Sequence, residues 1–278
     1  GNQIVCPSGS DWYRRDLSLR NYQILCSLFD GTFSLSFKAE NVYNKKFKVI
    51  KMFWIDSPKT GKIVEMFNKT FEKMLKIPTY EIFGNLFSEP YVTKNGAYLI
   101  RPYLDQPLIE RITDSPPLHY WEKKWIAYQL LHAVKNLGEQ GFWHGDIKPE
   151  NVMVSSSLQV FLVDHAPFKP SMIGTNQPHY FIHFFSYMRS CCFLAPERIT
   201  DSNKYINFFA ADIFSVACVI AYMYLNGQYL FNYTTIQQLK DNSDIPLLNF
   251  IDDQNIRDLL HNLLLVDHRA RLRNFHNF

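Results

Sequence analysis

Hydrophobic and polar residues alternate along the first part of the chain and predict a small β-sheet. Leu25 to Ala39 alternates on both sides of Asp30-Gly31-Thr32, which is typical of two strands joined by a tight connection. Phe47 to Trp54 and Ala97 to Leu104 are two further strand-like runs. Between them, Ile63 to Ile77 repeats its apolar positions at helical spacing. We therefore expect a sheet accompanied by one helix.

The remainder of the chain is patterned mainly as helices. Leu108 to Thr113 predicts a short helix, and Tyr120 to Leu137 predicts a long amphipathic one. Short β-like runs follow at Val152 to Val154 and at Val160 to Val163. Helical periodicity returns from about Ala210. The predicted fold class is α+β, with a small β-rich part followed by a larger, mainly helical part.

Composition favours a folded protein with a substantial core. The 278 residues are 47% hydrophobic and 16% aromatic, enough for one large domain or two lobes that share a core. The formal net charge of +3 is close to neutral for this length, so general nucleic-acid binding is not indicated. The five cysteines include no CxxC pair, which argues against a zinc site and favours the cytosol or nucleus.

The longest apolar run, Ile206 to Phe231, has the length of a membrane span. Asp212 and Asn226 interrupt it, and the stretch between them is too short to cross a bilayer comfortably. We therefore expect a buried core helix in this part of the chain.

The run His144-Gly145-Asp146-Ile147-Lys148-Pro149-Glu150-Asn151 places an acid, a lysine and an amide in one loop between a predicted helix and a predicted strand. Such a set suits phosphoryl transfer, in which a protein mainly positions groups and neutralises charge. Asp146 could accept a hydroxyl proton, Lys148 could contact the γ-phosphate, and Asn151 could bind a metal ion.

Four features occur in an order that resembles the signature set of the eukaryotic protein kinase superfamily over nearly the whole chain. They are a strand lysine, the loop, an aspartate that ends a strand, and an Ala-Pro-Glu triplet: Lys51, His144 to Asn151, Asp164 and Ala195-Pro196-Glu197. The resemblance implies a two-lobed protein-kinase-like fold. Its parts would be an N-terminal arm over residues 1–21, an N-lobe over 22–105 and a C-lobe over 106–278.

The same resemblance implies a role for each matching residue. Asp146 would be the catalytic base, with Lys148 beside it. Lys51 would bind the phosphates of ATP, or of another purine nucleotide, and pair with Glu72, or else with Glu65. The other implied residues are Asn151 and Asp164 for Mg²⁺, Gly31, Arg101 and Leu104 for the nucleotide, and Glu197, Asp212 and Arg271 for structural support. Asp212 would open the central buried helix and hold the catalytic loop.

Several positions depart from the kinase pattern. The phosphate-covering loop keeps only Gly31 of three usual glycines, so its backbone stays further from phosphate and nucleotide binding is expected to be weaker. Gly145 replaces an arginine that would read a phosphorylated loop. Asp164 is followed by His165-Ala166 instead of Phe-Gly, which introduces an imidazole expected to titrate near neutrality. Arg101 falls at the back of the expected nucleotide pocket, unless the strand register is shifted by one residue.

Within the superfamily, the chain resembles the kinase domains of the vacuolar protein sorting regulatory subunits of class III phosphatidylinositol 3-kinase complexes. The matching segments are Glu122 to Gln129, His144 to Lys148, Phe168-Lys169-Pro170, Ala211 to Ser215 and Cys218 to Ala221. The resemblance implies the lipid kinase catalytic subunit and its autophagy and sorting adaptors as partners. It also implies a cytoplasmic protein, peripheral on endosomal, vacuolar or autophagic membranes. The opening Gly1-Asn2-Gln3 resembles a myristoylated start, so Gly1 is the expected lipidation site.

Three functions remain open on the sequence. The first is a Ser/Thr protein kinase of low turnover, because the charged groups that the chemistry needs are present. The second is a catalytically inactive pseudokinase scaffold that binds nucleotide, which the reduced glycine loop and Gly145 favour. The third is a small-molecule kinase, because such enzymes also carry a His-Gly-Asp loop followed by asparagine; Ala195-Pro196-Glu197 argues against it.

Overall fold

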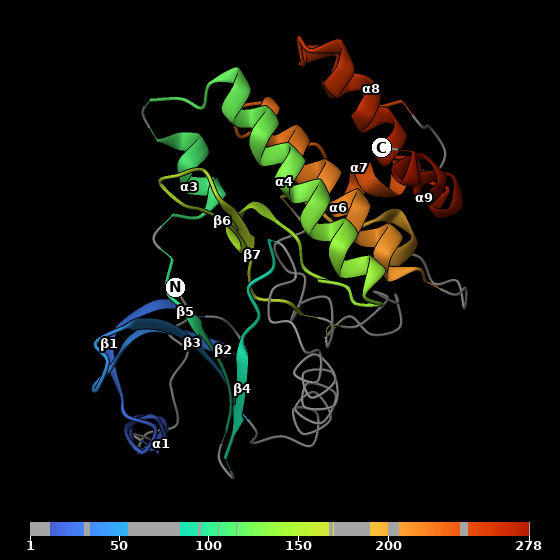
Figure 1. The fold of residues 1–278 in the computed structure, drawn as a ribbon. Coiled ribbons are helices and arrows are strands. Elements are labelled where there is room, and N and C mark those ends of the chain that lie inside the picture. Colours follow the sequence, from blue (N-terminus) through green and yellow to red (C-terminus); the bar gives the residue numbers. More distant parts are fainter. Residues whose placement is uncertain are drawn as a thin grey trace. The chain divides into compact units, whose positions relative to one another are not determined.

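The computed structural model describes residues 12–30, 34–54, 84–93, 96–104, 106–114, 116–166, 169, 190–199, 206–239 and 244–277. These residues form two compact units (Figure 1). The first is built on a β-sheet, and the second is mainly helical. This content confirms the predicted α+β class with its β-rich and helical lobes.

The first unit contains a five-stranded antiparallel sheet with the strand order β1-β2-β3-β5-β4. Its strands are β1 (Tyr22–Asp30), β2 (Ser34–Asn41), β3 (Phe47–Trp54), β4 (Glu89–Val92) and β5 (Gly96–Pro102). Four of them match the alternating runs of the sequence. The sequence did not predict β4, which has only four residues and contains Pro90. The predicted helix over Ile63 to Ile77 lies outside the described residues.

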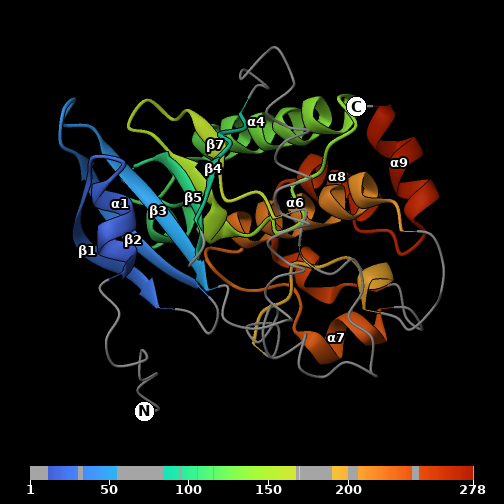
Figure 2. The ribbon, with the colours of Figure 1, turned by 90° about the horizontal axis from the view of Figure 1, so that it is seen from below.

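A short helix, α1 (Trp12–Ser18), covers one face of this sheet (Figure 2). Its Leu17 is fully buried, and the carboxylate of Asp16 accepts hydrogen bonds from the hydroxyls of Thr93 at 2.7 Å and Tyr98 at 3.0 Å. The sheet side chains in the core below it are Phe37, Ala39, Ile50, Met52, Tyr98 and Ile100. The predicted arm over residues 1–21 therefore includes a segment that packs on the sheet.

The opposite face of the sheet carries Lys51. The strand register pairs Lys51 with Leu99, and Val49 with Arg101. Residues paired across neighbouring strands point to the same face, and so do residues two apart on one strand. Arg101 is buried, and its Nη1 donates to the carbonyl of Pro102 at 3.2 Å. The register thus places two predicted nucleotide-binding residues, Lys51 and Arg101, on one face.

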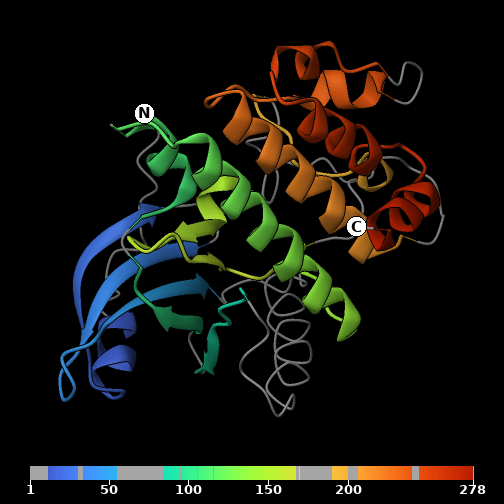
Figure 3. The same ribbon diagram turned by 45° about the horizontal axis from the view of Figure 1, so that its top comes forward.

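The second unit is built around two long helices that lie side by side, α4 (Tyr120–Glu139) and α6 (Phe208–Tyr224) (Figure 3). The C-terminal helix α9 (His268–His276) packs against α6. A two-stranded antiparallel sheet pairs β6 (Val152–Val154) with β7 (Val160–Leu162). The remaining elements are α3 (Leu108–Thr113), η1 (Pro149–Asn151), η3 (Pro196–Arg198), α7 (Tyr233–Gln238), η4 (Pro246–Phe250) and α8 (Gln254–Leu263).

Helix α6 is the apolar helix expected within Ile206 to Phe231. Every residue from Ala210 to Met223 is buried, as expected for a helix that is hydrophobic on all sides. The helix begins after Asn207, whose side chain accepts a hydrogen bond from the N–H of Ala210 at 2.9 Å. Among the described helices, none combines the length and the hydropathy that a membrane span requires.

Residues 84–86 precede β4 in the sequence but belong to the helical unit. The N–H of Leu162 donates to the carbonyl of Gly84 at 2.7 Å, and the N–H of Leu86 donates to the carbonyl of Leu162 at 2.9 Å. Gly84 has φ +70°, and a Cβ there would lie 2.8 Å from the Cβ of Ala133, so only glycine fits. The predicted boundary between residues 105 and 106 stays a prediction.

Candidate active site

The loop from His144 to Asn151 is fixed by Asp212, a buried residue of α6. The two carboxylate oxygens of Asp212 accept the backbone N–H groups of His144 at 2.5 Å and Gly145 at 3.0 Å. Burial raises the pKa of Asp212 to about 6, and the two N–H donors act against this rise. Gly145 has φ +79°, a conformation that glycine adopts without steric cost. The loop conformation therefore depends on one buried acceptor and one glycine.

A buried arginine, Arg198, supports the same loop from outside it. Its Nη1 donates to the carbonyl of Gly145 at 2.9 Å. Arg198 was not predicted from the sequence, because nothing local links it to the loop. Asp212 was expected at the start of the buried helix, and this detail is wrong. The helix begins at Phe208, with Asn207 as its N-cap, so Asp212 lies one turn further along.

Asp146 has a carboxylate surrounded by donors. Its Oδ2 lies 2.7 Å from Nζ of Lys169, 3.2 Å from Nδ2 of Asn151 and 4.0 Å from Nζ of Lys148. Nδ2 of Asn151 also donates to the backbone carbonyl of Asp146 at 2.8 Å. The structure thus brings together three predicted site residues and adds Lys169, which was not among the predicted site residues.

Lys148 keeps its positive charge in this setting. Burial lowers the pKa of Lys148, but the neighbouring carboxylates, Asp146 foremost and then Glu150, outweigh burial and leave the pKa raised. An ammonium group fixed beside the loop can neutralise phosphate charge.

The two predicted metal ligands, Asn151 and Asp164, are neighbours in the fold. The N–H of Val163 donates to the carbonyl of Asn151 at 3.0 Å, which brings the start of the Asp164 turn to Asn151. Asp164 itself has φ +59°, a conformation that aspartate tolerates better than most residues. Because Nδ2 of Asn151 faces Asp146, its Oδ1 is the atom suited to bind a cation.

This donor set fits Mg²⁺. Magnesium takes one or two oxygen ligands from a protein, while substrate phosphates and water complete its shell. Asn151 and Asp164 supply an amide and a carboxylate oxygen of this kind. Within the described ranges, no three His, Cys, Asp or Glu residues gather into a group that could hold a metal ion.

Two buried histidines, His144 and His165, lie side by side with their ring centroids 4.4 Å apart. The N–H of Asp146 donates to Nδ1 of His144 at 3.2 Å, so Nε2 carries the proton and donates to the carbonyl of Val163 at 2.8 Å. Nε2 of His165 lies 2.9 Å from Oδ1 of Asn85. Burial lowers the pKa of His144 to about 4 and the pKa of His165 well below its usual value. The expectation that His165 titrates near neutrality is therefore wrong.

We expect His144 to make the free energy of unfolding depend on pH. Its pKa is about 4 in the folded protein and about 6.5 when unfolded, so the unfolded chain binds a proton that the folded protein excludes. This contribution is complete above pH 6.5, the unfolded pKa, and is lost as the pH falls through about 4. It amounts to roughly 3 kcal/mol.

Denaturant unfolding between pH 4 and 7 measures this effect. Asp212 contributes with the opposite sign, because its pKa is raised, so wild type must be compared with His144→Gln. In the variant, the slope of the free energy of unfolding against pH should be smaller in that window, by the equivalent of about one bound proton. If the free energy of unfolding had the same slope against pH in wild type and in His144→Gln, this would contradict the lowered pKa of His144.

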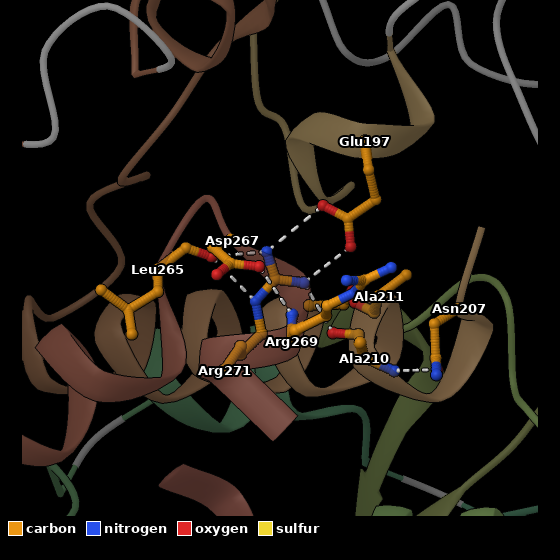
Figure 4. Close-up of polar contacts among 9 residues, drawn as sticks. Glu197, Asn207, Ala210, Ala211, Leu265, Asp267, Arg269 and Arg271 are labelled. Carbon is orange, nitrogen blue, oxygen red and sulfur yellow. Dashed lines mark hydrogen bonds and ion pairs between the residues drawn. The ribbon is translucent and has the colours of Figure 1, made fainter. Parts of the chain in front are cut away.

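Glu197 and Arg271 form an ion pair that joins η3 to α9 (Figure 4). The Nη1–Oε1 distance is 2.7 Å and the Nη2–Oε2 distance is 3.2 Å, a bidentate geometry. Arg271 is 0% exposed. It also donates from Nε and Nη2 to the carbonyl of Leu265, at 3.0 and 2.6 Å, and from Nη1 to the carbonyl of Ala210 at 2.8 Å. Every nitrogen of the buried guanidinium therefore has an acceptor.

The remaining predicted site residues belong to the first unit or fall outside the described residues. Lys51 lies on β3, with Nζ 5.8 Å from the ring centroid of Phe53, and Leu104 follows β5. Gly1, Gly31 and Glu72 lie outside the described residues, and so does Glu65. The nucleotide-binding and lipidation roles of these residues stay predictions.

Comparison with known proteins adds a family match that covers most of the chain. Residues 22–276 match the protein kinase domain family. Serine/threonine-protein kinase VPS15 of Arabidopsis thaliana is 32% identical over 294 residues, covering 98% of this chain and 19% of that protein. The serine/threonine-protein kinase VPS15 of Saccharomyces cerevisiae is 34% identical over 199 residues, covering 67% of this chain and 14% of that protein. The Schizosaccharomyces pombe protein of that name is 34% identical over 188 residues, covering 65% of this chain and 11% of its own length. The chain thus spans less than a fifth of the length of these relatives.

Proposed function

We propose, from the premise that this chain belongs to the protein kinase family, that it binds a purine nucleotide with Mg²⁺ and transfers phosphate at low turnover. The observation that carries the proposal is the arrangement around Asp146. Lys148 and Asn151 lie around its buried carboxylate, and Asp164 adjoins Asn151 through the backbone. Protein kinases use ATP and Mg²⁺ in general; a preference among nucleotides in this chain is part of the proposal.

The geometry suits transfer of the γ-phosphoryl group to a hydroxyl. The hydroxyl oxygen bonds to the γ-phosphorus, the β–γ bridging oxygen leaves with ADP, and the hydroxyl proton passes to the carboxylate of Asp146. Lys148 supplies a fixed positive charge beside this loop. Mg²⁺, when bound by Asn151 and Asp164, supplies charge neutralisation at the phosphate oxygens.

We further propose that the chain is the kinase-like domain of a class III phosphatidylinositol 3-kinase regulatory subunit. The matches to the VPS15 relatives support this assignment. The resemblance noted in the sequence for the segments from Glu122 to Gln129 and from Ala211 to Ser215 supports it as well. The lipid kinase catalytic subunit and its sorting and autophagy adaptors are the proposed partners. Co-purification of the intact protein with that catalytic subunit tests the assignment, and its absence from a stable complex would count against it.

Membrane association is proposed through Gly1. One myristoyl chain provides an affinity of only about 10⁴ M⁻¹, so stable residence on endosomal, vacuolar or autophagic membranes requires a membrane-bound partner as well. Intact-mass analysis of the protein from a eukaryotic host tests the modification. An unmodified N-terminal glycine would remove this part of the proposal.

A catalytically inactive scaffold that binds nucleotide is the second candidate function. The observation that favours it is the ion pair between Lys169 and Asp146, since it engages the carboxylate that transfer requires. A small-molecule kinase is less well supported, because Glu197 of the Ala-Pro-Glu triplet has a defined partner in Arg271. The low-turnover kinase and the inactive scaffold both require nucleotide binding, so nucleotide binding is the first property to measure.

We expect Mg²⁺-dependent nucleotide binding, and we expect Asp164→Asn to remove the dependence on Mg²⁺. The substitution removes the anionic oxygen ligand, and the affinity for Mg²⁺–nucleotide should fall on the order of tenfold or more. Calorimetric titration of ATP and GTP, with and without EDTA, gives the affinities. Asp252→Asn, at an exposed position, is the matched control and should bind as wild type does. Binding that neither EDTA nor Asp164→Asn alters would sink the proposed metal site.

A further inference from the structure

Lys169 lies against the carboxylate that the proposed chemistry uses as a base. Its Nζ is 2.7 Å from Oδ2 of Asp146, and the two side chains are only 11% and 6% exposed. Nδ2 of Asn151 donates to the same oxygen at 3.2 Å. A carboxylate oxygen offers two lone pairs, so these two donors fill Oδ2. At 4.0 Å, Nζ of Lys148 is too distant for a hydrogen bond to that atom.

The two lysines near Asp146 are therefore not equivalent. Lys148 is near enough to balance charge and far enough to turn toward a phosphate, whereas Lys169 makes direct contact with the carboxylate. Water and salt screen a buried pair much less than a surface pair, so this contact persists at physiological ionic strength. A substrate hydroxyl that donates to Oδ2 has to displace the ammonium of Lys169 first.

We propose that Lys169 is a positioning residue that restrains Asp146, because its ion pair occupies Oδ2, one of the two oxygens that can accept the proton of a substrate hydroxyl. The inference rests on the proposed function and deepens it. Transfer forms a bond between the hydroxyl oxygen and the γ-phosphorus, breaks the bond to the bridging oxygen and moves one proton to Asp146. The ion pair with Lys169 withholds one of the two acceptor oxygens of Asp146 and consumes no other reactant. Low turnover then coexists with the charged residues Asp146, Lys148 and Asp164 in the helical unit.

The alternative role for Lys169 is to bind phosphate, as proposed for Lys148. The two roles affect different kinetic parameters. A residue that restrains the base lowers kcat and leaves the affinity for ATP unchanged, whereas a phosphate ligand lowers the KM for ATP. The separation of kcat from KM therefore distinguishes them.

The test replaces Lys169 with methionine, which keeps the length of the side chain and removes its ammonium. In Lys169→Met, kcat for phosphate transfer to a generic Ser/Thr substrate such as myelin basic protein should rise on the order of tenfold, a fraction of the 10²–10⁴-fold that a positioned base contributes. The KM for ATP should stay within about twofold of wild type. Lys169→Arg retains the charge and should stay near the wild-type rate. Lys46→Met, at an exposed position, controls for the loss of a lysine.

A fall in kcat, an unchanged kcat or a rise in the KM for ATP overturns the inference, and so does the absence of transfer from both wild type and Lys169→Met. Melting temperatures show whether Lys169→Met folds, and Lys169→Gln takes its place with the same expected rise if it does not. Calorimetric titration with Mg²⁺–ATP separates this inference from the proposed function. Wild type that binds no nucleotide contradicts the proposed function, whereas normal binding without a rise in kcat contradicts only the role of Lys169.

Discussion

Replacing Arg271 with methionine is expected to lower the free energy of unfolding by about 3–5 kcal/mol, because it leaves the carboxylate of Glu197 without the partner that compensates its burial. The side chain of Glu197 is only 16% exposed, so water cannot fully replace the guanidinium. The carbonyls of Leu265 and Ala210 lose the hydrogen bonds from the guanidinium in the same step. The loss should appear as a lower denaturant midpoint with an unchanged m-value.

The control for this prediction lies on the same helix. Arg273 is exposed on α9, and Arg273→Met should change stability by no more than about 0.5 kcal/mol. A double-mutant cycle with Glu197→Gln isolates the pair itself, and the two substitutions together should cost less than the sum of the single losses. Equal losses for Arg271→Met and Arg273→Met would show that the buried network does not stabilise the helical unit.

The regular elements of the fold were predictable where a long pattern specified them. Alternation over Leu25 to Ala39 and Phe47 to Trp54 predicted β1, β2 and β3, because half-buried strands repeat every second residue. The continuous apolar run around α6 predicted a buried helix for a different reason, because a helix that is hydrophobic on all sides lies inside the protein. Helix α1 was missed, since seven residues are too few to show a helical period and Leu17 gains its burial only from the sheet.

The site was predictable where its residues are close in the sequence. Asp146, Lys148 and Asn151 share one loop, so their spacing alone brings them together. Lys169 and Arg198 reach the loop through tertiary contacts, and no local pattern identifies such contacts. The Glu197–Arg271 pair spans 74 positions, and only the resemblance to kinases suggested it.

The protonation state of His165 could not be predicted from the residue type. An imidazole in water titrates near neutrality, but burial beside His144 excludes the charged form. The same physics applies to Asp212, whose pKa is raised to about 6 by burial although its carboxylate accepts hydrogen bonds from two backbone N–H groups. Burial is a property of the folded chain, which the sequence pattern specifies only for whole elements.

Asp146→Asn is expected to lower phosphate transfer by about 10²–10⁴-fold. An amide has the size of the carboxylate, and its oxygen can still accept a hydrogen bond from Asn151, but it does not take up the hydroxyl proton. Nucleotide affinity should change far less, because the proposed phosphate and metal contacts lie on other residues. Transfer from [γ-³²P]ATP to a generic protein substrate, with calorimetric titration of Mg²⁺–ATP in parallel, measures both quantities.

Glu150→Gln supplies the matched control, since Glu150 is an exposed acid in the same loop and should tolerate the same chemical change. A rate that falls with Asp146→Asn and not with Glu150→Gln assigns the transfer to this loop and excludes a contaminating kinase. Equal residual rates in wild type and Asp146→Asn would mean that Asp146 accepts no proton. The protein would still bind nucleotide through other residues, so that result would favour the scaffold over the kinase. It would not contradict the fold or the ion pair between Lys169 and Asp146 in the wild type.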